Sequence, residues 1–203
     1  MARVEVSATK SNLMKMKDEL SFARDGKDLL SQKREVLVME MLRLQDEARK
    51  VREDLDQLLE RAYAAFITAS LLEGFDGMQR LALAIRPGVE MKLEERSVMG
   101  VILPIVSCEG REWRPDYGLG QGSHTSDRTV QLFLEVASRL CEVAEIETAI
   151  YRLAMETRKT IRRERALENK FIPEYSASIK YIEDTLEERE RETFYQLKLI
   201  KGN

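Results

Sequence analysis

Hydrophobic residues recur at alternating steps of three and four along residues 13–72. Such steps average about 3.5 residues, so the apolar positions stay on one narrow side of a helix, which is the pattern of a coiled-coil seam. The pattern predicts a helix roughly 90 Å long that is capped by Ser7 and ended by Gly74 and Gly77. Two seam positions, Lys27 and Arg34, are polar. The apolar ones are Leu13, Met16, Leu20, Ala23, Leu30, Leu37, Met41, Leu44, Ala48, Val51, Leu55, Leu58, Ala62, Ala65, Ala69 and Leu72.

A second and less regular stripe predicts another helix, from the capping pair Ser126-Asp127 almost to the last residue. Pro173 should bend this helix or lie where its backbone is locally opened. Between Thr157 and Ala166 only Ile161 is clearly apolar, so the seam is thin there. The stripe comprises Phe133, Val136, Leu140, Val143, Ile150, Ala154, Ile161, Phe171, Tyr175, Ile179, Ile182, Leu186, Leu197 and Ile200.

The residues between the two helices follow a different pattern. Residues 78–85 are expected to form a short helix, and residues 89–94 alternate between apolar and charged, which is typical of a half-buried strand. Residues 98–106 are expected to form the returning strand of a hairpin, with the reversal near 95–97 and residues 108–123 as a loop. Pro104 cannot donate to a ladder, so it should lie at an edge or at a strand end.

These elements predict a mainly α fold, a long antiparallel two-helix coiled coil with a small β-hairpin and loop insertion between the helices. The expected parts are an N-terminal helix at 1–74, an insertion at 75–125 and a C-terminal helix at 126–203. Each helix can bury its stripe only against the other, which should place Leu72 near Phe133 and Leu13 near Glu192. No enclosed pocket is expected from such a shape.

The composition narrows the possible functions. Of 203 residues, 34% are charged and 6% aromatic, and so few glycines and prolines argue against a β-sandwich or barrel. The net charge of −3 gives no general attraction to nucleic acid or to an anionic membrane. No apolar run approaches the roughly 20 residues of a membrane span, and no leader is recognisable. Cys108 and Cys141 lack metal-ligand spacing and are expected to be free thiols in a reducing compartment, so we expect a cytoplasmic protein.

Candidate chemical sites are few, and we expect neither a cofactor nor a metal. Residues 118–122 could be a phosphate loop but lack its Lys-Ser/Thr ending, so a flexible loop is favoured. His124, the only histidine, is expected to be solvated in the same loop. The acidic run at 183–192 is expected to form a solvated face with ion pairs. A basic collar is either a solvated face or a contact for an acidic partner, with nucleic acid least favoured; it consists of Arg158, Lys159, Arg162, Arg163 and Arg165.

Several segments resemble the D subunit of V-type and archaeal-type rotary ATPases. Residues 162–173 (RRERALENKFIP), 179–182 (IKYI) and 186–198 (LEERERETFYQLK) resemble the closing part of that family. Residues 9–13 (TKSNL), 26–30 (GKDLL) and 97–101 (SVMGV) are similar to its opening and middle motifs. Ala8 stands where the family usually has Pro, and residues 107–124 match no motif of the family.

The resemblance implies a non-catalytic central shaft that turns inside a ring of A and B head subunits. It also implies a small F subunit and a funnel-like subunit above the proteolipid ring as partners, with no direct membrane insertion. The residues that the resemblance places at head contacts are Lys10, Arg162, Arg163, Glu187, Arg189 and Arg191. The alternatives are a non-rotary coiled-coil adaptor and the stalk protein of an export ATPase, although the β-insertion argues against the latter.

Overall fold

The computed structural model describes residues 6–85, 89–110 and 122–202. The elements in chain order are helix α1 (Lys10–Ala84), strands β1 (Val89–Val98) and β2 (Val101–Gly110), helix α2 (His124–Ala166), a π-helical turn η1 (Leu167–Phe171) and helix α3 (Ile172–Lys201). They form two compact units. Unit 1 comprises Met1–Val36 with Glu156–Asn203, and unit 2 comprises Leu37–Met155. The predicted fold class, mainly α with long antiparallel helices and a small hairpin between them, is confirmed.

The cap of helix α1 lies two residues later than expected. Thr9, not Ser7, caps the helix, because its Oγ1 accepts the amide N–H of Asn12 at 3.2 Å. The Asn12 side-chain amide donates to the carbonyl oxygen of Ser7 at 2.8 Å and to its hydroxyl at 3.0 Å, which holds the preceding residues against the first turn. Ser7 therefore supports the helix start through Asn12 rather than by capping it.

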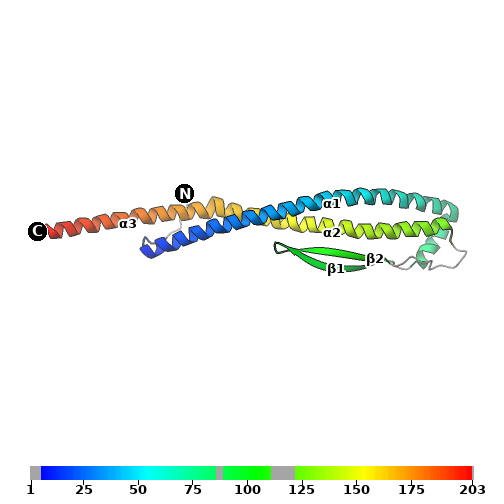
Figure 1. Cartoon of the computed structure of the whole chain (residues 1–203), viewed down its shortest axis with the longest axis horizontal. Helices are drawn as coiled ribbons and strands as arrows, with labels where there is room; N and C mark the ends of the chain where they lie inside the picture. The colour runs from blue at the N-terminus through cyan, green and yellow to red at the C-terminus, as the bar shows by residue number, and fades with distance from the viewer. Residues whose placement is uncertain (1–5, 86–88, 111–121, 203) are drawn as a thin grey trace. The chain divides into compact units, whose positions relative to one another are not determined.

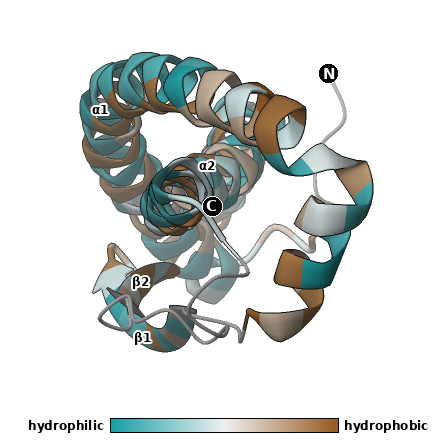
Figure 2. Ribbon diagram, turned by 90° about the vertical axis from the view of Figure 1, so that its right-hand side faces the viewer, coloured by the Kyte–Doolittle hydropathy of each residue, from teal (hydrophilic) through white to brown (hydrophobic). Residues whose placement is uncertain are grey.

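Gly74 and Gly77 were expected to end α1, but only Gly74 interrupts the helix, and Gly77 lies inside it. The φ of 73° and ψ of 162° at Gly74 lie outside the helical region, in backbone space that residues with a Cβ rarely enter. The chain then resumes helical geometry through Ala84, which includes most of the short helix predicted at 78–85. Figure 1 shows the helix changing direction at this kink, and Figure 2 shows the final turns of α1 carrying both hydrophobic and hydrophilic residues.

Strands β1 and β2 form a two-stranded antiparallel sheet with Val98 opposite Val101. The predicted reversal near residues 95–97 is wrong, since the turn residues are Met99 and Gly100, with φ of 50° and 79°. Two adjacent positive φ values match the right-handed twist of a tight hairpin. Gly100 adopts its positive φ without steric strain, because glycine has no Cβ. The returning strand accordingly begins at Val101 rather than at residue 98, and residues 108–110, expected in a loop, belong to it.

Pro104 lies in the interior of β2, opposite Glu95. In a two-residue hairpin the pairs alternate between hydrogen-bonded and non-hydrogen-bonded, starting from the hydrogen-bonded pair at the turn. Residue 104 falls at a non-hydrogen-bonded position, where the backbone N–H would point away from the partner strand. A proline is tolerated there because both strands of this sheet are edge strands.

The core of unit 2 joins α1, α2 and the hairpin. One buried cluster combines α1 and α2 residues with Val101 and Leu103 of β2, so the hairpin packs against the helices through one face. A second cluster lies further along the helices, and there Phe133 makes edge-on ring contacts with Tyr63 and Phe66 at centroid distances of 5.6 and 6.3 Å. The helical residues of the two clusters are Leu37, Leu44, Leu55, Leu58, Ala62, Val136, Ile146, Ala149 and Leu153.

The helices of unit 1 are also antiparallel, since Lys10 pairs with Glu190 and Lys17 with Glu183. The expected pairing of Leu13 with Glu192 and of Leu72 with Phe133 is therefore shifted by several residues, because Lys10 already meets Glu190 and the Phe133 ring lies against Tyr63 and Phe66. Side-chain pairs, rather than the length of the intervening segment, set this register.

The predicted seam residues differ in burial. Leu37, Leu44, Leu55, Leu58 and Ile182 are buried, whereas Leu13, Leu20, Phe133, Ile150 and Leu186 are half-buried. Six are exposed, contrary to expectation: Leu72 at 67%, Leu140 at 48%, Phe171 at 38%, Leu197 at 59%, Ile200 at 76% and also Ala154. A hydrophobic period identifies one side of a helix, but a partner must cover each position before its side chain is buried. Phe171 falls in the π-helical turn, where the helical period itself changes.

The backbone next to Pro173 is locally opened, as the sequence predicted. Residues Leu167–Phe171 form a π-helical turn directly before Ile172 and Pro173. The wider turn accommodates a proline that removes one helical hydrogen bond. Opposite this turn lies Gly26, whose added Cβ would come 3.8 Å from Cδ1 of Leu167, an ordinary contact distance.

Candidate functional site

A charged cluster joins the beginning of α1 to α3 in unit 1. The Nζ of Lys10 lies 2.8 Å from Oε1 of Glu190, and the Arg189 guanidinium donates to the carbonyl oxygen of Ala8 at 3.0 Å. On the same helix Arg191 donates to Glu187 at 2.9 Å. The structure thus brings together four of the six predicted head-contact residues, Lys10, Glu187, Arg189 and Arg191, which we call the terminal cluster.

The terminal cluster contains an exposed but chemically coupled ion pair. The hydrogen bond from Lys10, together with its charge, lowers the pKa of Glu190, and the same contact raises the pKa of Lys10. Both side chains remain mostly in water, where such pairs contribute little to stability. Their charges stay available to a partner, and the cluster borders a shallow hollow of about 500 Å³ with Leu13, Met14, Glu183 and Leu186.

Helix α3 continues beyond the terminal cluster with its apolar residues uncovered. Every described residue from 191 to 202 is exposed, although this stretch is helical to Lys201. Exposed aromatic and aliphatic side chains in such number are typical of surfaces that contact another protein. They are Phe194, Tyr195, Leu197, Leu199 and Ile200, which we call the α3 tail.

Arg162 and Arg163, the other two predicted contact residues, lie on the exposed surface of α2 in unit 1. The whole basic collar is exposed, and Lys159 makes an ion pair with Glu156 at 3.5 Å. The next residue along, Glu164, is 8% exposed and lies 3.5 Å from Arg34. Glu164 therefore faces the opposite helix and is not an acidic partner of the collar arginines.

The thin part of the predicted seam is filled by polar residues. Lys27 and Arg34, the two polar positions in the first stripe, pair with Glu168 at 3.2 Å and Glu164 at 3.5 Å. Thr157 and Thr160 are buried beside them along α2. The Thr160 hydroxyl donates a hydrogen bond to the carbonyl oxygen of Glu156 in its own helix. The spacing of three residues from Ile161 could have marked Glu164 as a seam position, but nothing in the sequence indicated that Arg34 is its partner.

Lys33 adds another cross-helix pair in unit 1, with Glu156 at 3.5 Å. Burial raises the pKa of Glu156, but the charges of Lys33 and Lys159 and their hydrogen bonds outweigh this effect, so its pKa is lowered overall. In these five cross-helix ion pairs every cation comes from α1 and every carboxylate from the C-terminal helices. The cations are Lys10, Lys17, Lys27, Lys33 and Arg34. This distribution of charge favours the antiparallel pairing seen here.

The acidic run at 183–192 is engaged as expected in exposed ion pairs. Glu187 pairs with Arg191 on its own helix, whereas Glu183 and Glu190 pair across to α1. Among the described residues, no group of three or more His, Cys, Asp or Glu side chains is arranged to hold a metal ion. His124 is exposed at the first residue of α2 rather than in a loop, and residues 118–121 of the possible phosphate loop lie outside the described residues.

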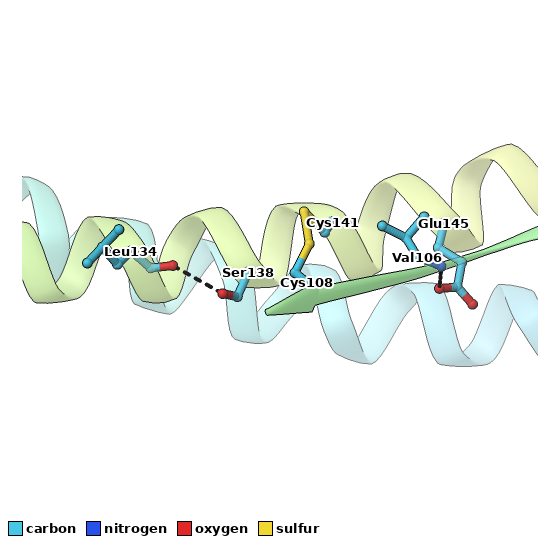
Figure 3. Close-up of a disulfide and its surroundings, with 6 residues drawn as sticks. All are labelled: Val106, Cys108, Leu134, Ser138, Cys141 and Glu145. Atoms are coloured by element: carbon cyan, nitrogen blue, oxygen red, sulfur yellow. Dashed lines mark hydrogen bonds between the residues drawn. A yellow bond between two sulfur atoms is a disulfide. The ribbon is translucent and has the colours of Figure 1, made fainter. Parts of the chain in front are cut away.

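The two cysteines form a disulfide, which overturns the expectation of free thiols. Cys108 of β2 is bonded to Cys141 of α2, with a Cα–Cα distance of 6.7 Å (Figure 3). The sequence separation of 33 residues gave no sign of this contact, because it arises only when the hairpin packs against α2. The assignment to a reducing compartment, which rested on free thiols, loses that support.

Unit 2 also contains an apolar groove of about 360 Å³ that no pattern in the sequence predicts. It forms where the turns after the Gly74 kink approach the start of α2. Its walls include Tyr63, Phe66, Met78, Leu81, Val130 and Phe133. The hydrophobic period of a single helix cannot reveal such a groove. The two walls of the groove come together only because the kink changes the direction of the chain.

Two long antiparallel helical segments with a β-hairpin inserted between them define a class of mainly α proteins. No helix among the described residues is long and apolar enough to cross a membrane. The chain belongs to the family of ATP synthase D subunits, whose model matches residues 12–202.

Full-length relatives support this assignment. The chain is 38% identical to the D subunit of the V-type ATP synthase of Thermotoga neapolitana, over 98% of this chain and 98% of the relative. It is 34% identical to the D subunit of the A-type ATP synthase of Thermococcus sibiricus, over 100% and 96% of the two chains. The corresponding protein of Methanosarcina acetivorans is 35% identical over 100% of this chain and 98% of its own.

Proposed function

We propose that this chain is the non-catalytic central shaft of a V-type or A-type ATPase. In this role it transmits torque between a head that hydrolyses or synthesises ATP and a membrane ring that translocates ions. The observation that carries the proposal is the antiparallel helix pair, joined by cross-helix ion pairs in unit 1 and by two buried apolar clusters in unit 2. The names of the relatives, which are D subunits of V-type and A-type ATP synthases, support the same assignment.

Paired helices suit torque transmission for a mechanical reason. A single helix twists easily about its axis, whereas two helices whose side chains interlock must slide past each other before they twist. Leu37, Leu44 and Leu153 are almost fully buried in the core of unit 2, and such packing resists sliding. The disulfide between Cys108 and Cys141 attaches the hairpin to the same helix pair.

The terminal cluster and the α3 tail are the surfaces that we assign to the A and B head subunits. The cluster offers exposed charges of both signs, and Arg162 and Arg163 add exposed positive charge on α2. Exposed pairs in water are weak, so they can exchange partners as the shaft moves from one head subunit to the next. A shaft with different faces would then bias chemically equal sites toward different conformations.

The remaining partners in this proposal are the small F subunit and the funnel-like subunit above the proteolipid ring. The chain would work on the cytoplasmic side as a peripheral part of a membrane-bound complex. The apolar groove near the Gly74 kink and the exposed outer face of the hairpin are free surfaces for such contacts in unit 2.

Rotation measured on an assembled complex tests the proposal. The chain is expressed with A and B subunits of a related ATPase, and a bead is attached through an engineered cysteine at Glu94, an exposed residue of β1. The labelling is done on oxidised protein, in which the native cysteines are joined to each other and so do not compete for the label. We expect the chain to enter the complex and the bead to rotate while ATP is hydrolysed, with no rotation when hydrolysis is blocked.

The same preparation separates the alternatives. A complex that forms and hydrolyses ATP while the bead stays still would favour a non-rotary adaptor. Failure to assemble with A and B subunits would remove the shaft function altogether, and assembly with export-ATPase subunits instead would point to a stalk protein of that system. Nucleotide turnover by the isolated chain would contradict the non-catalytic assignment.

A further inference from the structure

Strand β2 is attached to α2 by two backbone hydrogen bonds and one disulfide. The backbone N–H of Val106 donates to Oε2 of Glu145 at 2.7 Å, and the carbonyl oxygen of Ile102 accepts from Arg152 at 2.9 Å. Cys108 is bonded to Cys141 on the same side (Figure 3). Side chains of α2 therefore take the place that a third strand would occupy.

The regular spacing of these contacts follows from the register of the hairpin. Residues 102 and 106 belong to non-hydrogen-bonded pairs, so their backbone groups point away from β1, whereas Cys108 contacts α2 through its side chain. Residues 141, 145 and 152 are separated by four and seven positions, which places them on one face of α2. The disulfide is the covalent member of this series and lies closest to the open end of the hairpin.

Burial differs strongly between the two ends of the hairpin. Near the turn, Val101 and Leu103 belong to the core of unit 2. Toward the open end, Ile105 on the same face is only half-buried and Ser107 is exposed, so less apolar burial holds that end of the hairpin. The attachment of this end therefore depends on the disulfide to a degree that the turn end does not.

We propose that the Cys108–Cys141 disulfide is a reversible redox latch that holds the open end of the hairpin on α2. Both cysteines are half-buried rather than enclosed, which leaves them accessible to a dithiol reductant. A thiolate of the reductant attacks one sulfur to give a mixed disulfide, and its second thiol displaces the protein. The reductant leaves as a disulfide, and two electrons and two protons pass to Cys108 and Cys141.

Opening the latch has a local consequence. The core contacts of Val101 and Leu103 remain, so the turn end of the hairpin stays packed. The open end loses its covalent attachment and keeps only the hydrogen bond of Val106 to Glu145 in this series. This inference concerns the folded chain itself and does not depend on the proposed shaft function.

Hydrogen exchange on the full chain tests the latch. Protein oxidised with glutathione disulfide is compared with protein treated with dithiothreitol, a small dithiol, and alkylation followed by mass measurement counts the thiols in each. We expect no free thiol in the oxidised protein and two after reduction. Amide exchange at residues 105–110 should accelerate by at least about tenfold on reduction, while residues 101–103 change by less than about twofold.

The paired variant Cys108→Ser/Cys141→Ser is the matched control. It should exchange like the reduced protein in both buffers, and re-oxidation of the native chain should restore slow exchange. Free thiols after oxidation would overturn the proposal. So would an unchanged rate at 105–110, or acceleration spread evenly over the chain, since that would mean loss of global stability instead of release of one end.

Discussion

Leu44 illustrates how sharply neighbouring residues of α1 differ in environment. Its side chain is 3% exposed and belongs to the core cluster of unit 2, whereas Leu42, on the same turn, is 53% exposed. The two leucines have the same helical propensity, so a substitution at either position separates burial from local structure.

We predict that Leu44→Asp destabilises unit 2 by about 3 kcal/mol or more, because it buries an unpaired charge and removes core packing. Leu42→Asp should change stability by less than about 0.5 kcal/mol. Urea unfolding followed by helical circular dichroism measures both. Equal effects of the two substitutions would refute the assignment of Leu44 to the core.

Glu40 connects α1 to the hairpin through charge. Arg43 donates two hydrogen bonds to its carboxylate, at 2.8 and 3.0 Å, and Arg96 of β1 approaches at 3.4 Å. The hydrogen bonding of Arg43 lowers the pKa of Glu40; burial opposes this, and the charges of Arg43 and Arg96 add to the lowering. A lowered pKa means that the folded state favours the ionised carboxylate.

The contribution of Glu40 to stability is therefore present above the ordinary pKa of 4.5 and is lost as the pH falls through the lowered folded value. We predict that Glu40→Gln costs about 1 kcal/mol at neutral pH and reduces the loss of stability on acidification. Denaturation curves between pH 7 and pH 3 measure this. Glu53→Gln, an exposed position of the same helix, is the control, and an acid response of the Glu40→Gln variant identical to that of the native chain would contradict the prediction.

At the scale of the helix, two glycines of α1 have opposite roles. Gly74 has a φ of 73° and makes the kink, and nothing lies within 4 Å of the position that its Cβ would take. Gly26 lies in regular helix, and its added Cβ would make only an ordinary contact with Leu167. Backbone conformation, not space, is thus the constraint at Gly74.

We predict that Gly74→Ala destabilises the chain by about 1–3 kcal/mol, because alanine must adopt a strained backbone or straighten the kink. Gly26→Ala should stabilise it by roughly 0.5–1 kcal/mol through higher helical propensity. Thermal unfolding measured on both variants gives the comparison. A neutral Gly74→Ala would show that the kink does not require glycine.

The two units of the molecule are stabilised by different kinds of contact. The buried residues of unit 1 are mainly small or polar, with Ile179 and Ile182 as its large apolar members. Unit 2 buries leucines from both helices together with Val101 and Leu103 of the hairpin. Apolar burial is the larger contribution to stability, while exposed ion pairs are weak and are screened by salt.

We therefore expect unit 1 to lose hydrogen-exchange protection at lower urea concentration than unit 2. Raising the salt concentration from about 0.05 to about 0.5 M should weaken protection in unit 1 more than in unit 2. Exchange resolved by peptide along a urea series measures both effects. Simultaneous loss of protection in the two units, at both salt concentrations, would show that they unfold as one.

Particular residues show how far the sequence alone could lead. The steps of the first stripe indicated α1, and Pro173 indicated the opened turn beside it. Gly74 and Gly77 were expected to end α1, whereas Gly74 only interrupts it. The alternation at 89–94 indicated β1, but the turn was expected several residues early, because Met99 adopts a positive φ that its residue type does not favour. The polar positions Lys27 and Arg34 were recognised without their partners Glu168 and Glu164.

The sequence by itself determined the elements and the family, because helical and strand periods, caps, breakers and family motifs are local properties of the chain. Only the tertiary structure decided which side chains meet: the register of Lys10 with Glu190, the exposure of Leu72 and Leu140, and the apolar groove. The bond between Cys108 and Cys141 belongs to the same group. These contacts depend on how separate elements pack, and no pattern within one element records the position of another.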